Sequence, residues 1–182
     1  KLKKTREPKK EEIDGYIIQM VETKIRLSQL RGDSVEEIRA SVMAIEGAAG
    51  KTYFEALSFI IPEQYAFEGR SRNPAKDPFN AFLNYGYGIL YSKVERACVI
   101  SGLDPYIGLL HTDNYGKKSF VFDVIELYRA MIDEIVIKLF SKRMVKQDMC
   151  RELPKGVALD KPGKELLIGE YNKEMDETVR YR

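Results

Sequence analysis

The chain has 182 residues, 44% of them hydrophobic and 32% charged, which is ordinary for a globular protein with one core of normal size. It contains no apolar stretch of the length that a membrane span needs, so we expect a soluble protein without membrane contacts. The net charge is only +2, and Cys98 and Cys150 lack metal-type spacing, which favours reduced thiols and a cytoplasmic protein.

A basic segment opens the chain. "KLKKTREPKK" (1–10) carries six Lys or Arg against one Glu, a composition typical of a solvated linker, with a nucleic-acid-binding arm as the alternative. The chain begins without Met or a signal peptide, so we expect it to be a piece of a longer protein. Residues 1–12 are then a linker or the remnant of an upstream region, and residues 13–182 form one helical domain.

Helical periodicity predicts two long helices in the first third of the chain. Apolar residues follow helical spacing from Ile13 to about Leu30, where "RGDS" interrupts the pattern. Ser34, with Glu37 three residues later, is typical of a capping box that begins a second helix. We expect this second helix to end before Pro62.

One acidic residue of the second predicted helix stands out. The segment "EGAAG" (46–50) places two glycines inside the helix, at about 1 kcal/mol each relative to alanine, which predicts that another group comes close to the backbone. Glu46 lies at the edge of the apolar stripe, where a carboxylate requires a partner. That partner is either an arginine in tight helix packing or a bound cation.

A long loop and a third helix follow. Residues 62–78 contain three prolines and a glycine, which predicts a loop of the length that often carries function. Asp77 followed by Pro78 is typical of a helix N-cap with proline at the first helical position. We expect the third helix to run from there to Gly102.

The last clear helix follows two irregular segments. "GLDPYIGLLH" (102–111) predicts a turn with a short apolar piece, and "TDNYGKK" (112–118) predicts a second loop. Residues 119–143 then show the strongest amphipathic pattern of the chain. Alternating strand patterns are absent, so the predicted fold class is all-α.

The only histidine, His111, precedes two acids in an apolar run, Asp123 and Glu126. A lone histidine after "GLL" is more often a core or loop residue than a ligand. The two acids are three residues apart and share one helix surface, as in an ordinary ladder of surface charges. Large apolar neighbours on both sides argue against that reading.

Taken together, these side chains suit a divalent cation. One imidazole nitrogen with carboxylate oxygens fits Mg²⁺ or Mn²⁺ better than zinc, and such a cation polarises a phosphoryl oxygen. Basic side chains close to the acids in sequence favour a polyanionic substrate. These basic residues are Lys51, Arg70, Arg72, Lys117 and Lys118.

Four motifs, in order along the chain, resemble those of the CRISPR-associated Cas-one family, the metal-dependent endonucleases and integrases of spacer acquisition. They are "IEGAAGKTYFEAL" (45–57), "FEGRSRNPAKDPFNAFLNYGYGILY" (67–91), "GLDPYIGLLH" (102–111) and "SFVFDVIELYR" (119–129). The resemblance begins at about residue 16. Beyond Ile135 it thins, and residues 146–182 are similar to the family's variable C-terminal part.

The resemblance implies a fold and a set of site residues. The fold is a compact all-α catalytic domain that lacks the family's N-terminal β-domain. The residues matching the family's metal ligands are Glu46, His111 and Glu126, and Asp123 matches an auxiliary catalytic acid. Those matching the family's DNA path are Arg70, Arg72, Asn80, Asn84, Tyr85 and Tyr91.

The implied reaction is attack of a free 3′-hydroxyl of a captured DNA fragment on a phosphodiester at the edge of a CRISPR repeat. The implied partners are double-stranded DNA, a second copy in the full-length homodimer and the CRISPR-associated Cas-two protein. A fused upstream module is an alternative origin of the basic N-terminus. Two alternative functions are a related transposon integrase and a non-catalytic DNA-binding or scaffold domain of the same fold.

Overall fold

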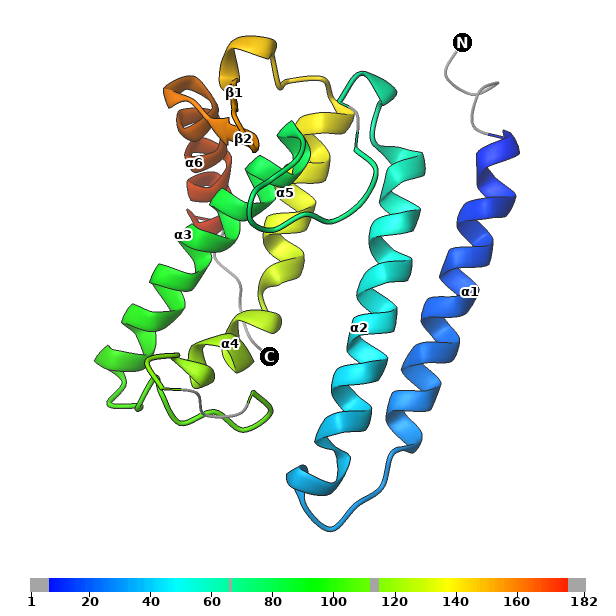
Figure 1. The fold of residues 1–182 in the computed structure, drawn as a ribbon, viewed down its shortest axis with the longest axis vertical. Coiled ribbons are helices and arrows are strands. Elements are labelled where there is room, and N and C mark those ends of the chain that lie inside the picture. The colour runs from blue at the N-terminus through cyan, green and yellow to red at the C-terminus, as the bar shows by residue number, and fades with distance from the viewer. Residues whose placement is uncertain (1–6, 66, 112–114, 177–182) are drawn as a thin grey trace. The chain divides into compact units, whose positions relative to one another are not determined.

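The computed structural model describes residues 7–65, 67–111 and 115–176, so predictions for residues 1–6, 112–114 and 177–182 lie outside the described residues. The chain divides into two compact units, residues 1–62 with 68–70, and residues 63–67 with 71–182. Helices dominate both units (Figure 1), which confirms the predicted fold class. Within the described ranges, no helix is long and apolar enough to cross a membrane.

The first unit is a pair of long helices, α1 (Glu7–Gln29) and α2 (Val35–Ile60), that run side by side (Figure 1). The helix α1 begins at Glu7, before the predicted Ile13. Periodicity could not predict its first turns, because residues 7–12 are five charged residues and a proline. Ser34 caps α2 as predicted, since its side chain accepts a hydrogen bond from the backbone N–H of Glu37. The return bond of the predicted capping box differs, because the Glu37 carboxylate accepts from the backbone N–H of Asp33. The rings of Tyr16 and Phe59 lie 5.6 Å apart and join the two helices.

The second unit is built around α3 (Pro78–Ile100) and α5 (Arg129–Ser141), with α4 (Ser119–Glu126) and α6 (Lys161–Asp176) packed against them. Its core is aromatic. The ring of Phe140 lies 4.6 Å from Tyr65, 5.0 Å from Phe79 and 5.3 Å from Phe82, in edge-to-face arrangements. Phe79, Phe82 and Phe140 are fully buried, so this cluster is the centre of the unit.

Both ends of α3 follow the prediction. Asp77 caps its first turn, since the side chain accepts a hydrogen bond from the backbone N–H of Asn80 at 2.8 Å, and Pro78 is the first helical residue. At the other end Gly102 has φ of +72°, the left-handed conformation in which glycine is favoured. The helix therefore lies between the two sequence signals that predicted it.

The prediction of one continuous helix over residues 119–143 is wrong. The structure has α4 and α5, separated by Leu127 and Tyr128. The backbone N–H of Leu127 bonds to Val124 and that of Tyr128 to Ile125, a tight i→i−3 pattern that turns the chain. The buried residues Ile125 and Ile132 are seven positions apart, two helical turns, so apolar periodicity continues across the turn and cannot reveal it.

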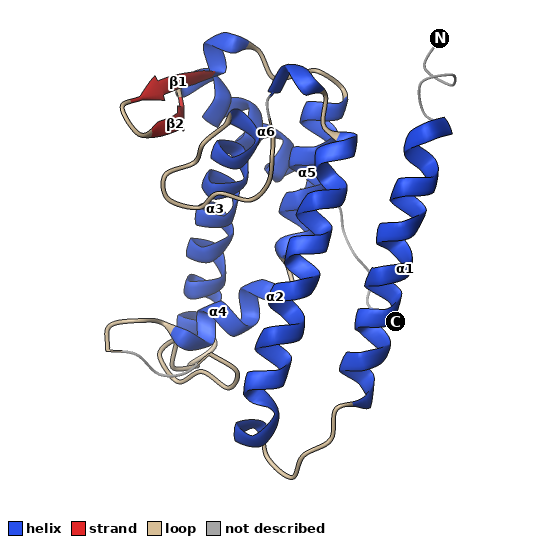
Figure 2. Cartoon of the chain, turned by 45° about the vertical axis from the view of Figure 1, so that its right-hand side comes forward, coloured by secondary structure: helices blue, strands red, loops and turns tan. Residues whose placement is uncertain are grey.

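A small hairpin was not expected. Strands β1 (Cys150–Leu153) and β2 (Gly156–Leu159) pair antiparallel in the register Cys150↔Leu159 to Leu153↔Gly156, beside α3 and α6 (Figure 2). Four-residue strands are too short for alternation to be recognised. The backbone N–H of Val157 bonds to the carbonyl oxygen of Ala75 at 2.8 Å, which ties the hairpin to the loop before α3.

The C-terminal helix α6 is held to α5 by a charged cluster. Glu170, 7% exposed, lies 2.9 Å from Lys138 of α5 and 2.5 Å from Lys173 of its own helix. The hydrogen bonds from Lys138 and Lys173 lower the pKa of Glu170 to about 2. The carboxylate is therefore ionised at neutral pH, where two ammonium groups compensate its burial.

Candidate functional site

The predicted ligand His111 lies on a loop that wraps around Asp123 of α4. The backbone N–H groups of Leu109 and Leu110 donate to one oxygen of Asp123, at 2.5 and 3.0 Å, and that of His111 donates to the other at 2.9 Å. The imidazole Nδ1 of His111 lies 2.7 Å from that second oxygen. One carboxylate thus fixes both the backbone and the ring of the histidine.

These contacts determine the charge of Asp123 and the tautomer of His111. Burial alone would raise the pKa of Asp123, but the hydrogen bonds from the His111 ring and from three backbone N–H groups outweigh it and lower that pKa. An ionised carboxylate can only accept, so Nδ1 carries a hydrogen and donates it. In the neutral tautomer that this bond selects, the lone pair is on Nε2, the arrangement common to histidine ligands with a carboxylate behind them.

The histidine loop depends on close packing at Gly108. A Cβ added there would lie 2.5 Å from the carbonyl oxygen of His111 and 2.6 Å from Cβ of Ser119, so a side chain would push the loop away from α4. The ring of Phe122 lies 5.9 Å from that of His111 and 5.5 Å from that of Tyr91 on α3. The imidazole therefore has a fixed aromatic neighbour as well as a fixed carboxylate.

Glu126, the second predicted ligand of this unit, is the last residue of α4. Its carboxylate lies 2.6 Å from the guanidinium of Arg129, and 28% of its side chain is exposed. The pair spans the turn between α4 and α5. The sequence placed Asp123 and Glu126 on one helix surface, and the α4 helix confirms that spacing.

Glu46, the third predicted ligand, belongs to the first unit, whereas His111 and Glu126 belong to the second. It is exposed on α2. Within the described part of the first unit, no atom beyond the neighbouring helix backbone lies within 4 Å of a Cβ added at Gly47 or Gly50, so α1 does not make the close approach predicted from these glycines. Nor do the described residues contain three or more His, Cys, Asp or Glu gathered closely enough to hold a metal ion.

Two of the predicted DNA contacts lie in the first unit. Lys51 on α2 lies 3.8 Å from Glu55, and 80% of its side chain is exposed. The guanidinium of Arg70 lies 5.8 Å from the ring centroid of Phe54. An exposed ion pair of this kind is weak, so Lys51 can exchange its partner at little energetic cost.

The two predicted asparagines lie on α3 and bond to the loop before it. Asn80 is fully buried, and its side chain accepts from the backbone N–H of Ser71 at 2.8 Å and donates to Asp77 at 2.6 Å. Asn84 donates to the carbonyl oxygen of Arg72 at 2.5 Å. The two asparagines therefore order the loop that presents the exposed Arg72. Sequence reasoning identified Asp77 as a helix cap but did not predict that Asn80 binds both Asp77 and the loop. The available signal was an asparagine three residues after the cap.

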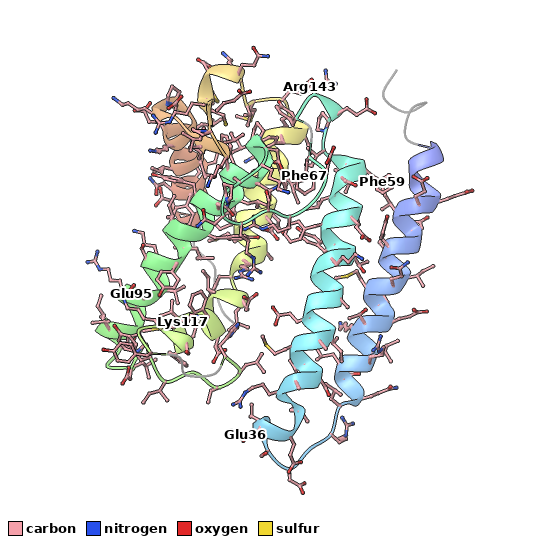
Figure 3. All side chains as sticks on the ribbon, viewed as in Figure 1. Glu36, Phe59, Phe67, Glu95, Lys117 and Arg143 are labelled. Atoms are coloured by element: carbon pink, nitrogen blue, oxygen red, sulfur yellow. The ribbon has the colours of Figure 1, made fainter. Side chains whose placement is uncertain are left out.

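Lys118 and Lys117 precede α4, at the end of α3 where Glu95 lies (Figure 3). Lys117 is exposed. Lys118 lies 2.5 Å from Glu95, and that hydrogen bond raises its pKa, so the ammonium remains charged. Tyr85, which precedes Glu95 on α3, has the ammonium of Lys164 5.7 Å from its ring centroid. Sequence reasoning missed Glu95, because a partner on another helix leaves no signal in local spacing.

Comparisons with known proteins give the family. The family described as "CRISPR associated protein Cas1" matches residues 1–173. A CRISPR-associated endonuclease Cas1 of Archaeoglobus fulgidus is 36% identical over 163 residues, which cover 86% of this chain and 47% of that protein. One from Thermus thermophilus is 41% identical over 101 residues, which cover 55% of this chain and 30% of that protein. The chain thus spans less than half the length of these relatives.

Solved structures agree with the sequence relatives. A Cas1 protein from Thermotoga maritima matches with a TM-score of 0.73 and 26% identity, over 94% of this chain and 58% of that one. A casposase bound to an integration product has a TM-score of 0.79, and a Cas6-RT-Cas1–Cas2 complex one of 0.84, each at 22% identity. These two cover 96% and 97% of this chain and 51% and 19% of theirs, and they show a shared fold. The chain belongs to the CRISPR-associated Cas1 family.

Proposed function

We propose that this chain is the catalytic part of a divalent-metal-dependent DNA integrase and endonuclease of CRISPR adaptation. Residues 13–182 are its proposed helical domain and residues 1–12 its proposed linker, the last six residues of which continue α1 as a helix. Residues 146–182 are its proposed variable end. The protein acts in the cytoplasm on double-stranded DNA, as a homodimer at full length and together with Cas2. A fused upstream module is part of the proposal. It is supported by the structural similarity to the Cas6-RT-Cas1–Cas2 complex, whose name joins Cas1 to two other modules.

The observation that carries the proposal is the pairing of His111 with Asp123. The family's ligand pattern assigns the metal to Glu46, His111 and Glu126, and a bound Mg²⁺ or Mn²⁺ would supply charge stabilisation at the phosphoryl group. The donor chemistry fits, because Asp123 binds Nδ1 of His111 and leaves Nε2 as the ring nitrogen for a metal ion, and Glu126 contributes a carboxylate. The role of Asp123 is to orient the ring.

The proposed reaction is transesterification without a covalent enzyme intermediate. The 3′-oxygen of the captured fragment forms a bond to phosphorus, the bond from phosphorus to the repeat's leaving oxygen breaks, and the proton passes from the attacking to the leaving oxygen. With water as the nucleophile, the same site would hydrolyse DNA. The protein's own contribution is to hold the phosphodiester and the attacking 3′-hydroxyl in the relative orientation that the reaction requires.

Cationic and polar side chains support DNA as the substrate. Lys51, Arg70, Arg72 and Lys117 are proposed contacts to phosphate oxygens, and Lys118 is a further one that must exchange its bond to Glu95. Tyr85 and Tyr91 are proposed to line the DNA path along α3. Asn80 and Asn84 are proposed to act through the loop that they order.

The test is strand transfer of a 5′-labelled fragment with a free 3′-hydroxyl into a repeat-containing duplex, in a protein of full family length with Mg²⁺ or Mn²⁺. Glu46→Ala and His111→Ala should each lower joining by at least about 100-fold, more than is typical when a residue behind the ligands is removed. Glu55→Ala, on the same helix as Glu46, is the matched control and should join normally. Normal joining by both Glu46→Ala and His111→Ala would contradict the proposal, and DNA binding without joining by the parent would identify a scaffold.

A further inference from the structure

The side chains behind Glu126 form a connected set that the ligand assignment does not use. Glu126 ends α4 and Arg129 begins α5, so their 2.6 Å ion pair bridges the two residues of the intervening turn. Backbone hydrogen bonds of that turn fix the two helix ends relative to each other. Charge-assisted bonds of this length are strong, and the planar guanidinium restricts where the carboxylate can lie.

Arg129 also contacts a residue of α3. The guanidinium carbon lies 5.3 Å from the ring centroid of Tyr87, a cation–π contact. Among the described residues, Nε of Arg129 is buried and has no hydrogen-bond partner. A buried donor without a partner costs free energy. The guanidinium keeps this position despite that cost, so we attribute the position to its ion pair with Glu126 and its contact with the Tyr87 ring.

Tyr87 is itself fixed by a second residue of α5. Its hydroxyl donates a hydrogen bond to the carboxylate of Asp133, which is 9% exposed. Asp133 lies four residues after Arg129, so the two occupy one face of α5, and Tyr87 contacts both. The ring of Tyr87 therefore cannot move away from Arg129 without breaking a buried hydrogen bond.

We infer that Arg129 is a positioning residue for the metal ligand Glu126, and that Tyr87 and Asp133 hold Arg129 in place for this purpose. The inference rests on the proposed function, in which Glu126 binds Mg²⁺ or Mn²⁺. Residues behind metal ligands commonly change metal affinity 10- to 100-fold when they are altered. Here three residues act in series, from α3 and α5 to the end of α4, so their effects converge on one carboxylate.

The experiment measures Mn²⁺ binding to the chain by isothermal titration calorimetry, without DNA. Arg129→Lys keeps the positive charge but loses the planar fork, and should weaken Mn²⁺ binding by about tenfold. Tyr87→Phe keeps the ring but loses the hydroxyl, and should weaken binding by about threefold. Because both act through the same carboxylate, the double variant should be no weaker than Arg129→Lys alone, which is a non-additive cycle.

Matched controls separate positioning from general damage. Arg151→Lys, on β1, and Tyr171→Phe, a buried tyrosine of α6, make the same chemical changes away from Glu126 and should bind Mn²⁺ like the parent. Thermal unfolding followed by circular dichroism identifies any variant that binds poorly because it is unfolded. Asp133→Ala gives an independent variant, since it removes the acceptor of the Tyr87 hydroxyl and should reproduce the effect of Tyr87→Phe.

The outcomes distinguish this inference from the proposed function. If Glu126→Gln and His111→Ala lose Mn²⁺ while Arg129→Lys and Tyr87→Phe bind it normally, the metal site stands and the positioning role is wrong. Additive losses in the double variant would also contradict it. If the parent binds no Mn²⁺, or Glu126→Gln and His111→Ala bind it as the parent does, the proposed metal site itself is wrong, and the inference with it.

Discussion

Asp123 is the residue on which the histidine loop depends. Its carboxylate accepts hydrogen bonds from three backbone N–H groups and from the imidazole of His111. A carboxylate is suited to this role because it offers several acceptor positions and no donor, so all four groups point toward it without conflict. An amide of the same shape would place a donor opposite one of those N–H groups.

We therefore expect Asp123→Asn to lower the free energy of unfolding by about 1–3 kcal/mol at pH 7. The folded-state pKa of Asp123 is below its unfolded value of about 3.9, so its stabilisation is fully present above that value and is lost as the pH falls through the folded-state pKa. The difference between parent and variant in urea denaturation should accordingly shrink below about pH 4.

The control for this prediction is Asp104→Asn in the same loop. Asp104 is exposed, and its side chain accepts one backbone hydrogen bond, from Tyr106 at 2.9 Å. Its substitution should change the free energy of unfolding by less than about 1 kcal/mol. A difference for Asp123→Asn that stayed constant from pH 7 to pH 3 would contradict the ionic explanation.

At the scale of elements, the sequence predicted what depends on local chemistry. The caps at Ser34 and Asp77 and the glycine at the end of α3 act through neighbouring backbone groups, so their signals are visible in sequence. The α4–α5 turn is different, because apolar residues keep helical spacing through it. The hairpin could not be predicted for another reason. The strand β2 is bonded through Val157 to Ala75, about 80 residues away in sequence, and local patterns carry no signal of such a contact.

The candidate site shows the same division. Spacing alone put Asp123 and Glu126 on one surface, and the family resemblance joined Glu46, His111 and Glu126 into one predicted ligand set. No local pattern predicts that Asp123 binds the histidine ring, or that Arg129 contacts Tyr87 of another helix. These contacts depend on how α3, α4 and α5 pack, which is determined by the buried aromatic core.

At the scale of the whole molecule, the two units differ in how much core they contain. Among described residues that precede Glu63, only Leu57 and Ile61 are buried, and large apolar side chains such as Ile18 (59%) and Ile17 (54%) are exposed. The second unit contains the interlocked rings of Phe79, Phe82 and Phe140. A pair of helices without its own core is marginally stable in water.

We expect residues 63–182, produced alone, to keep a cooperative thermal transition, because their core is complete within the second unit. Residues 1–62 alone should show partial helix content that declines gradually on heating. Circular dichroism melting of both pieces checks this. A non-cooperative melt of 63–182 would show that its stability depends on the first unit.

Because the sequence contains a single histidine, proton NMR can follow metal binding at His111 without isotope labelling. With one histidine in the sequence, proton NMR contains one Cε1–H resonance, and it belongs to His111. The nitrogen proposed to bind the metal is bonded to that carbon, so sub-stoichiometric Mn²⁺, which is paramagnetic, should broaden this line before those of distant tyrosine rings. Mg²⁺, which is diamagnetic, should shift it without broadening. The spectrum would then follow occupancy of the site directly, with no DNA, no label and no turnover.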